Sequence, residues 1–560
     1  MIRPIRRLRA LVAITALAWA AGAGRAAAQG TATLPASDLA YSDIQRLSEL
    51  SFLDSIIIGQ QPYSRREIGR ILRAARERSN KLGEGHVSHR ITDLELAIGD
   101  GILRRLEERF SREVDSDASE DAVISPIDGV SLVTSATDAP RRRFPATHTQ
   151  SIEATTGSLL RRRLGDPIEP GIASALELSQ RLEPTTWLAF TARERFQLFR
   201  PRDTTVTEGA ADLLLGTVRA RFGNAAISVG REQLAWAQSQ HDGLFLASDA
   251  PALDQISLAS DHPFGLPGFL NWLGPAKAII VVADLGQSRV RSHSKLLAYK
   301  VSVQPSRRAE FGATFMNHFG GKGGRASSVT NQLIDFLPFV DIFRHHNYTD
   351  SSGTLDVDSD KLLGIDGRLR VGGLRGVLIT GEMLIDDFDV HRIPQLFTGD
   401  GSQTLGITLP RLVSPLLSLR LSAKHMGTIT YSHSSLTNGI ATRGRLLGDE
   451  LGPDAKAFGA ALVWEPTAAA RFSLEGRSAI YSNAEYQATY ADADSVRYVV
   501  SKVSHTDDEL RDRLGLSAIV QSEAGPAVTF RVVGERARNY LFQGGRRTFY
   551  AAELGFHLQQ

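Results

Sequence analysis

The sequence contains no cysteine, which excludes a disulfide framework and any thiolate metal site. Long apolar runs are missing after the N-terminus, because no stretch approaches the roughly 18 consecutive apolar residues that a membrane-spanning helix requires. An excess of either charge is missing too: 64 basic residues balance 62 acidic residues, leaving a net charge of +2. That balance gives no indication of a nucleic-acid partner. An apolar content of 42% fits a soluble protein or a barrel with a wet interior equally well.

Residues 1–28 have the pattern of a secretory signal peptide. Arginines precede an apolar stretch over residues 10–19, and three alanines then form a cleavage site before Gln29. A membrane anchor is the alternative, but the apolar stretch is short and a cleavage site follows it. We therefore expect the protein to leave the cytoplasm.

Residues 29–122 are predicted to form a small α-helical bundle. Ser64 and Glu67 have the spacing of a capping box, and apolar residues at helical spacing follow them. A second apolar stripe includes Leu94 and ends at Phe110. An acidic, polar linker then separates the helices from the rest of the chain, and we place the domain boundary there.

From residue 123 to 560 the apolar period changes to two, which is typical of strands with one apolar and one polar face. In the segment 455–478, Phe458 and Trp464 lie on the apolar face before a Pro turn, and the alternation resumes after it. Short turns alternate with long polar segments along this region. That layout predicts a large antiparallel transmembrane β-barrel of roughly 16 to 20 strands, with the apolar faces toward lipid.

Charges of both signs occupy the polar faces, and we predict that they line a lumen and remain solvated. They are Arg193, Arg195, Arg219, Arg221, Asp366, Arg368, Arg370, Arg420, Lys424, Arg471, Glu475 and Arg477. The last strand alternates as far as Leu558, as in the assembly signal of outer-membrane barrels, although the chain ends in two glutamines rather than in an aromatic residue. The arginine triplets at 141–143 and 161–163 are predicted to sit at a barrel rim, near lipid headgroups or lipopolysaccharide.

Two motifs permit a metal interpretation. His345 and His346 are adjacent, so they would point apart on a strand, and a solvated loop is favoured. Asp356, Asp358 and Asp360 have the carboxylate spacing of a calcium loop but lack its glycine and distal glutamate. We expect no metal or other cofactor, with calcium at these three aspartates left open.

Three motifs follow one another along the predicted barrel: Gly-Arg with a Trp and a Ser-ended loop, a Glu with an Asp pair, and an Arg with Leu-Gly and Gly-x-Asp. Their residues are Gly230, Arg231, Trp236 and Ser248; Glu382, Asp386 and Asp387; and Arg445, Leu447, Gly448, Gly452 and Asp454. In this order they resemble the Wzi family of outer-membrane capsule-assembly proteins. The chain departs from the family at Asp449, where the family often has histidine.

This resemblance implies an eighteen-stranded barrel with a periplasmic helical bundle, which binds capsular or related exopolysaccharide without catalysis. Sugars bind to aromatic faces that carboxylate, guanidinium and amide groups surround. We predict polysaccharide contacts at Arg231, Trp236, His241, Asp242, Asn317, His318, Asp386 and Asp387. We also expect a monomer that contacts outer-membrane lipid and lipopolysaccharide, and whose helical bundle could dock a periplasmic partner.

Two other classes of function remain open. The arginine-rich lumen would also suit a porin or a specific channel for anionic or sugar solutes. A continuous pore would favour that alternative, whereas loops folded into the lumen would favour polysaccharide attachment. An outer-membrane enzyme would need a clustered nucleophile, base and oxyanion donors, and the sequence shows no such spacing.

Overall fold

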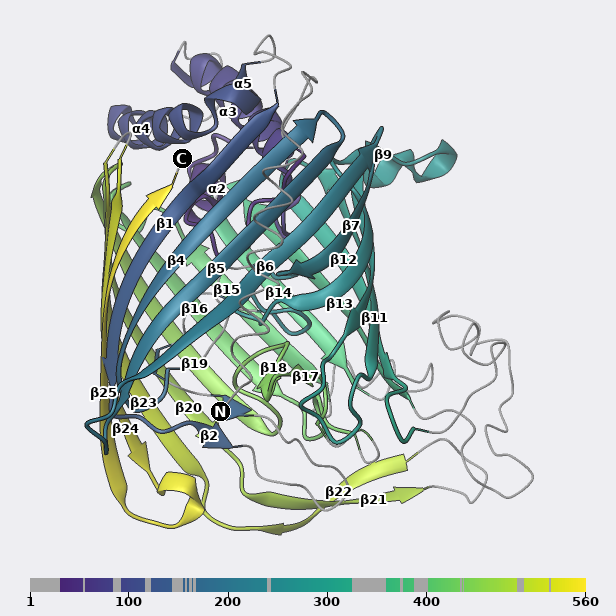
Figure 1. Cartoon of the computed structure of the whole chain (residues 1–560), viewed down its shortest axis with the longest axis vertical. Coiled ribbons are helices and arrows are strands. Elements are labelled where there is room, and N and C mark those ends of the chain that lie inside the picture. Colours follow the sequence, from purple (N-terminus) through teal and green to yellow (C-terminus); the bar gives the residue numbers. More distant parts are fainter. Residues whose placement is uncertain are drawn as a thin grey trace.

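The computed structural model describes residues 31–53, 56–83, 92–115, 122–143, 155–156, 159–160, 164, 168–238, 243–324, 359–372, 376–386, 401–433, 436, 438–490, 498–522 and 525–559. Within these residues the chain forms a closed antiparallel β-barrel with helices at one end (Figure 1). The predicted signal peptide lies outside the described residues.

The barrel wall is one continuous sheet. Among the described residues the sheet has 19 strands, but β8 and the two-residue β9 pair one after the other with β10, so the wall is eighteen strands round. The strand number that the resemblance implies is thus confirmed. The strands are β1 (Val123–Thr137), β4 (Gly171–Thr185), β5 (Leu188–Pro201), β6 (Glu208–Phe222), β7 (Ala225–Glu232), β8 (Leu253–Ser260), β9 (Phe264–Gly265), β10 (Pro275–Asp284), β11 (Lys295–Ser306), β12 (Ala309–Phe319), β13 (Ser359–Val371), β14 (Val377–Ile385), β15 (Ser402–Leu409), β16 (Leu417–Met426), β19 (Ala455–Thr467), β20 (Ala470–Tyr481), β23 (Glu509–Gln521), β24 (Ala527–Arg538) and β25 (Arg546–Gln559).

The barrel closes between its first and last strands. β1 pairs with β4 on one side and with β25 on the other, so Val130 lies opposite Leu558. Closure leaves no exposed sheet edge, which a barrel in lipid requires because an unpaired edge would leave backbone groups without partners. Three small hairpins lie outside the wall: β2 (Arg142–Arg143) with β3 (Thr155–Thr156), β17 (Ala441–Thr442) with β18 (Arg445–Leu446), and β21 (Ala484–Tyr490) with β22 (Tyr498–His505).

The two ends of the barrel differ. At the end where the helices lie, connections such as residues 186–187, 223–224 and 468–469 are tight turns, and we call it the turn end. Longer connections, including residues 233–252 and 427–454, are at the opposite end, which we call the loop end. This separation of short and long connections is typical of transmembrane barrels.

The β19–β20 hairpin shows which face of the wall is apolar. Phe458 is 62% exposed and Trp464 is 48% exposed on the outside of the barrel, whereas Ala457 and Val463 between them are buried. Exposed apolar side chains on the outer face of a closed barrel face lipid, because exposing such a large apolar surface to water would be energetically unfavourable. The predicted orientation of this hairpin toward lipid is therefore confirmed.

Residues 31–115 form what we call the N-terminal unit, with helices α2 (Ala40–Glu49), α3 (Arg65–Gly83), α4 (Asp93–Arg109) and α5 (Ser111–Val114). The predicted capping box at Ser64 is half formed: Glu67 N–H donates to Ser64 Oγ at 3.1 Å. A complete box begins α4, where Thr92 and Glu95 bond reciprocally. Leu94 is 41% exposed, so its predicted place in the buried stripe is wrong. None of the described helices is long and apolar enough to cross a bilayer.

Helix α2 lies in the turn end of the lumen, where buried ion pairs hold it. Arg46 Nη1 is 3.2 Å from a Glu49 carboxylate oxygen, and its Nε pairs with Glu465 on β19. Arg420 on β16 reaches Glu49 from the wall at 3.3 Å, and Arg471 on β20 lies 3.5 Å from Asp43. Each buried charge has an opposite charge within reach, so the helix docks without an isolated ion.

The segment after α2, residues 56–61, continues along the lumen wall. Glu310 on β12 accepts the backbone N–H groups of Ile58 at 2.9 Å and Gly59 at 2.8 Å. Lys277 on β10 donates to a carbonyl of the same segment at 3.2 Å. The N-terminal unit is thus bound to the barrel by side chains of several strands.

The charged set that we predicted to face the lumen does so, but five of its members, Arg193, Arg195, Arg219, Asp366 and Arg368, are buried, and the others are partly buried. Arg195 is 2% exposed and Arg368 is 7% exposed. Arg195 pairs with Glu177 at 2.7 Å, and Arg368 donates to Ser48 of α2 at 3.1 Å. For the buried members the prediction of solvation is wrong because it assumed an open lumen, whereas the N-terminal unit and two loops fill much of it.

The docking of α2 is expected to weaken in acid. Burial alone would raise the pKa of Glu49, but the guanidinium groups of Arg420 and Arg46 bring it below its ordinary value of 4.5. Since folding lowers this pKa, Glu49 stabilises the docked state above pH 4.5, and that stability is lost as the pH falls through the lowered pKa. Amide hydrogen exchange in α2, corrected for intrinsic rates, should therefore speed up on acidification in the wild type more than in Glu49→Gln. Equal pH dependence in both proteins would contradict this.

Candidate functional site

Two loops fold back into the barrel from the loop end. These lumen loops, described at residues 233–238 and 243–252 and at residues 427–433, 436 and 438–454, pack against inward-facing wall residues in one apolar cluster. Figure 1 shows the β17–β18 hairpin of the second loop within the outline of the barrel. The main buried members from the loops are Leu234, Trp236, Leu244, Phe245, Tyr431, Ile440, Leu447 and Leu451. An apolar core inside the lumen means that the loops are structural components of a filled barrel.

Tyr431 joins the two lumen loops to the wall. Its hydroxyl donates to the Leu244 carbonyl at 2.6 Å and accepts the Asp449 N–H at 3.0 Å, while its own N–H donates to Asp386. Burial raises the pKa of Tyr431 well above its ordinary value, and nearby Asp449 raises it further, so the hydroxyl stays protonated and can donate. The residue has φ 65, an unfavourable backbone conformation for a bulky side chain, which these contacts maintain.

Carboxylates on the wall hold the first lumen loop. Glu382 on β14 accepts the N–H groups of Gln238 at 3.1 Å and Leu244 at 2.8 Å. The Gln238 amide donates to Asp366 at 2.6 Å and to Glu310 at 3.1 Å. Because Glu310 also accepts a hydrogen bond from the N-terminal unit, this one carboxylate contacts both the N-terminal unit and the first lumen loop.

The N-terminal unit and the first lumen loop also bond directly. Gln61 and Ala235 exchange backbone hydrogen bonds of 2.9 and 3.2 Å in an isolated antiparallel bridge. The second lumen loop is fixed to another part of the barrel by Arg289, whose guanidinium donates to the carbonyls of Gly439 and Ala441. The interior is therefore one connected assembly from the helices to the loop end.

Trp236, the aromatic residue predicted to contact sugar, is a member of this interior. It is 1% exposed, and its N–H donates to the Leu246 carbonyl at 2.8 Å. Its indole N–H has no hydrogen-bond partner among the described residues. In this conformation the indole supports the first lumen loop and offers no face to a ligand outside.

Three other predicted contact residues lie around the same assembly. Asp386 is 2% exposed and accepts from Tyr431. His318 Nε2 lies 3.1 Å from Arg289 Nη2 and 2.9 Å from Ser294 Oγ. Asn317 is also fully buried, but successive residues on β12 point to opposite faces of the wall, so it does not share a surface with His318.

The remaining predicted residues are not brought into this assembly. Arg231 forms a bidentate ion pair with Asp254 on β8, in which Nε and Nη2 lie 2.6 and 2.7 Å from the two carboxylate oxygens. The predicted contacts at 241, 242 and 387, like the aspartates at 356 and 358, lie outside the described residues. Asp360 is fully buried on β13. Within the described part of the chain, no group of three or more His, Cys, Asp or Glu side chains could hold a metal ion.

The arginine triplets were predicted to lie at a rim. Arg142 lies at the loop end, beside the last residue of β20 and the first of β23, but it is 3% exposed and so does not face lipid headgroups. It pairs with Glu509 at 3.3 Å and lies 3.7 Å over the ring of Tyr481. Arg141 is exposed and pairs with Glu169. The second triplet lies outside the described residues.

A cavity remains between the wall of the barrel and the N-terminal unit and lumen loops inside it. A cavity of about 570 Å³ extends from α2 to the lumen loops, and Gln45, Lys424, Asp449, Glu475 and Arg477 are among its lining residues. Its charges are paired, as in the contact of Arg477 with Glu450 at 2.5 Å. Such a lining can hold water or a polar solute without selecting either sign of charge.

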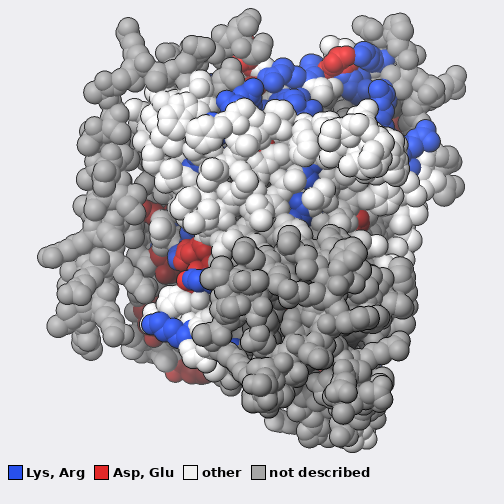
Figure 2. Space-filling model, turned by 90° about the vertical axis from the view of Figure 1, so that its right-hand side faces the viewer, with Lys and Arg blue, Asp and Glu red and all other residues white. Residues whose placement is uncertain are grey.

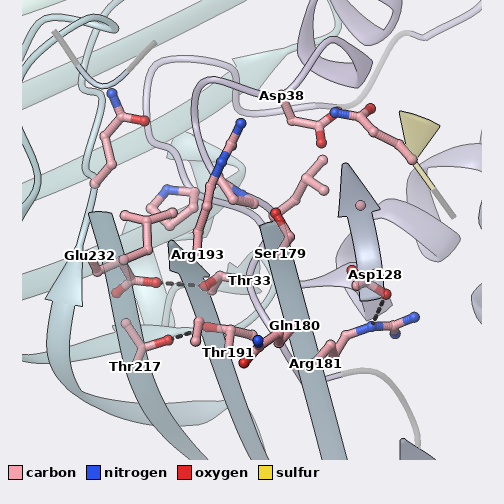
Figure 3. Close-up of a pocket in the computed structure, with 18 of the residues that line it drawn as sticks. Thr33, Asp38, Asp128, Ser179, Gln180, Arg181, Thr191, Arg193, Thr217 and Glu232 are labelled. Atoms are coloured by element: carbon pink, nitrogen blue, oxygen red, sulfur yellow. Dashed lines mark hydrogen bonds and ion pairs between the residues drawn. The ribbon is translucent and has the colours of Figure 1, made fainter. Parts of the chain in front are cut away.

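A second, smaller pocket of about 70 Å³ lies beside the N-terminal unit (Figure 3). In this close-up, Thr33 from the N-terminal unit donates to Glu232 at 2.6 Å, and Arg181 pairs with Asp128 at 2.9 Å. The pocket is too small for a sugar ring, so we regard it as part of the interface between the N-terminal unit and the wall.

Sequence reasoning missed several residues that organise the interior. Tyr431, Arg289 and Glu310 each connect segments more than a hundred residues apart, or connect a loop to the wall. Glu310 had one available signal, a carboxylate on the inward face of an apolar strand. No local pattern marks Tyr431 or Arg289.

Comparison with known proteins gives consistent matches. The family model described as capsule assembly protein Wzi matches residues 141–535. A solved Wzi from Escherichia coli, described as an outer membrane protein involved in group 1 capsule assembly and a carbohydrate-binding β-barrel, has 14% identity and a TM-score of 0.61, covering 96% of this chain and 100% of that chain. Pseudomonas aeruginosa OprD has 10% identity and a TM-score of 0.42, covering 78% and 95%.

A curated relative is an uncharacterised 55.8 kDa protein in the cps region of Klebsiella pneumoniae. It is 24% identical over 171 residues, which is 30% of this chain and 32% of the relative. The matched segment thus spans about a third of that relative's length. The family match covers more than half of the chain and the barrel wall has the expected strand number, and so this chain belongs to the capsule assembly protein Wzi family.

Proposed function

We propose that this outer-membrane protein holds capsular or related surface polysaccharide at the cell surface by binding it, without making or breaking a bond. Membership of the capsule assembly family and the likeness in fold to a carbohydrate-binding barrel support this. The observation that carries the proposal is the filled lumen, in which Tyr431 and Glu382 tie two loops to the wall. A barrel closed in this way is suited to presenting a surface rather than to passing solutes.

The orientation that we propose places the turn end in the periplasm and the loop end outside the cell. Tight periplasmic turns and long external loops are the usual arrangement of outer-membrane barrels. The N-terminal unit then fills the barrel from the periplasm, and its outer helical faces remain available to a periplasmic partner. A monomer suffices, because the wall closes within one chain.

The external surface that we favour is formed by residues 285–294 and 320–324. These segments pack together through the Lys322 N–H and the Ser292 carbonyl, 2.8 Å apart. Gln287, His293 and Lys322 are exposed there. Amide, imidazole and ammonium groups on one surface can hydrogen-bond sugar hydroxyls and attract an acidic polysaccharide.

The buried residues of the earlier prediction take a different role in this proposal. His318 lies directly beneath this surface, where Arg289 connects it to the second lumen loop. Trp236 and Asp386 hold the loops in place. We therefore assign these three as positioning residues for the loop end, whereas the exposed polar side chains contact the glycan.

Binding of the purified protein to immobilised surface polysaccharide separates these roles. Lys322→Ala should weaken binding roughly 5-fold to 10-fold, about the loss of one charge-assisted hydrogen bond, without lowering thermal stability. Trp236→Phe should instead act mainly on stability, lowering it by about 1–2 kcal/mol, with a smaller loss of affinity than Lys322→Ala because it acts only through the position of the loops. Lys456→Ala is the matched control, because Lys456 is exposed on β19, away from residues 285–294.

Two results would overturn the proposal. Wild-type protein that binds no polysaccharide while conducting ions through a steady open channel would favour the porin alternative. Equal losses of affinity in Lys322→Ala and Lys456→Ala would show that the favoured surface makes no specific contact.

A further inference from the structure

One connection at the turn end differs from its neighbours. Most turns there join adjacent strands directly, as residues 307–308 do between β11 and β12, but residues 261–274 between β8 and β10 contain β9 and a 3₁₀-helix, η2 (Gly268–Leu273). Figure 1 shows η2 projecting sideways from the barrel wall, beside β9. The projection places η2 outside the lumen and alongside the barrel.

The connection is built to hold η2 in one position. β9 pairs with Pro275 and Ala276 of β10, which fixes the base of the connection. Gly274 has φ 73, and a Cβ there would collide with the Gln304 carbonyl on β11. Only glycine fits this close approach, and it brings the end of η2 against the wall.

A 3₁₀-helix has three residues per turn, so η2 has three distinct edges. Phe269 and Trp272 share one edge and are 84% and 71% exposed. Leu270 and Leu273 share the second edge and are half-buried, and η2 contacts β11. Asn271 lies on the third edge and is exposed. One edge therefore suits the barrel wall, one suits an apolar medium and one suits water.

The apolar medium at this level of the barrel is lipid. Elsewhere at the turn end, Trp187 stacks on Phe222 with centroids 6.2 Å apart, and Trp464 stacks on Phe472 at 5.4 Å, all four on the outer surface. Tryptophan in such positions marks the boundary between lipid and water. The aromatic edge of η2 continues this boundary outward from the wall.

Basic side chains lie close to the same boundary. Arg307 and Arg308 are exposed in the β11–β12 turn, next to the strand that η2 contacts. Figure 2 shows lysine and arginine side chains gathered along the upper rim of this face of the molecule. Near an anionic bilayer each such charge contributes about 1 kcal/mol of attraction, so phospholipid headgroups suit this rim.

We propose that η2 is a membrane foot: Phe269 and Trp272 insert among the phospholipids of the leaflet on the turn-end side, and Asn271 faces water. The foot fixes the depth and tilt of the barrel in the bilayer, and with them the height of the loop end above the opposite surface. Its occupant is lipid rather than a second copy of the chain or another protein, because the aromatic edge is continuous with the lipid-facing wall.

The absence of cysteine makes a clean test available. Two single-cysteine variants, Trp272→Cys and the control Val413→Cys, are each labelled with a polarity-sensitive fluorophore. Val413 is a suitable control because it is 82% exposed in the β15–β16 turn at the same end of the barrel. The labelled proteins are reconstituted into vesicles of zwitterionic and anionic phospholipid. We expect spin-labelled lipid to quench the label at 272 at least about threefold more strongly than the label at 413, and aqueous iodide to show the opposite order.

A second measurement needs no label. Brominated phospholipid should quench the intrinsic fluorescence of the wild type more than that of Trp272→Phe. Equal accessibility of both labels to iodide, with no lipid quenching at 272, would overturn the proposal. Energy transfer between labels at 272 that rises with protein-to-lipid ratio, in place of lipid quenching, would assign this edge to a second copy and would overturn it as well.

Discussion

Arg46→Ala is expected to release the N-terminal unit from the barrel. The substitution removes the cation that Glu49 and Glu465 share inside the turn end, and also a hydrogen bond to the Pro415 carbonyl at 2.9 Å. Breaking a buried ion pair by removing one partner typically costs about 3–5 kcal/mol, because the remaining charge stays buried without full compensation. Limited proteolysis should therefore cut the helices of the variant while the barrel remains intact.

Two further proteins separate this effect from a general loss of stability. Arg104 is exposed on α4, and Arg104→Ala should leave the proteolysis pattern unchanged. Adding Glu465→Gln to Arg46→Ala removes one of the two carboxylates that have lost Arg46 as a partner and should restore part of the protection. Helices that stay protected in Arg46→Ala, or that are equally exposed in Arg104→Ala, would contradict the docking that we describe.

Tyr431→Ala is expected to free the lumen loops. It deletes a fully buried ring and the two hydrogen bonds of its hydroxyl, the one donated to Leu244 and the one accepted from Asp449. It also removes the packing that holds the backbone N–H of residue 431 against Asp386. Truncating a buried aromatic residue costs about 3–5 kcal/mol. The ratio of open to closed loops should rise by roughly two to three and a half orders of magnitude, because each 1.4 kcal/mol is a factor of ten.

Planar-bilayer conductance and proteolysis at the loop end report this opening. Tyr431→Ala should conduct in steps that the wild type lacks, and Tyr431→Phe, which loses only the hydroxyl, should lie between them. Tyr550→Ala is the control, since Tyr550 is 62% exposed on the lipid face. Wild-type conductance equal to that of Tyr431→Ala would contradict a loop-closed lumen.

The wall of the barrel could be predicted from the sequence because its signal is local. In β19 and β20, apolar and polar residues alternate, and a strand converts that alternation directly into two faces. The tight turn between them sets the register. The same reasoning placed the charged residues inside, since only one of the two faces could meet lipid.

The contents of the lumen could not be predicted, because they depend on contacts between distant segments. Glu310 accepts hydrogen bonds from Ile58 and Gly59, which are about 250 residues away in sequence. No local sequence pattern at either position predicts this contact. The sequence pattern of the charged residues in the wall is the same whether water or a helix covers their side chains. The solvation of the buried members, such as Arg195 and Arg368, was therefore predicted wrongly, although the direction of the set was predicted correctly.

The candidate site shows the same limit at single residues. An aromatic residue in a polar loop can face a ligand or support the loop, and Trp236 lies in the apolar core of the lumen. Asn317 and His318 were both predicted to contact polysaccharide, but they are adjacent on a strand, which points neighbouring side chains to opposite faces. The resemblance in motif order nevertheless identified the family, because it depends on spacing along the chain rather than on exposure.

The central claim is that this barrel retains polysaccharide at the cell surface. The most direct measurement compares cell-bound with released polysaccharide in a strain that lacks the gene and in the same strain with the gene restored. We predict that deletion moves polysaccharide into the medium at constant total amount, and that restoration returns it to the cells. An unchanged distribution in the deletion strain would contradict the claim.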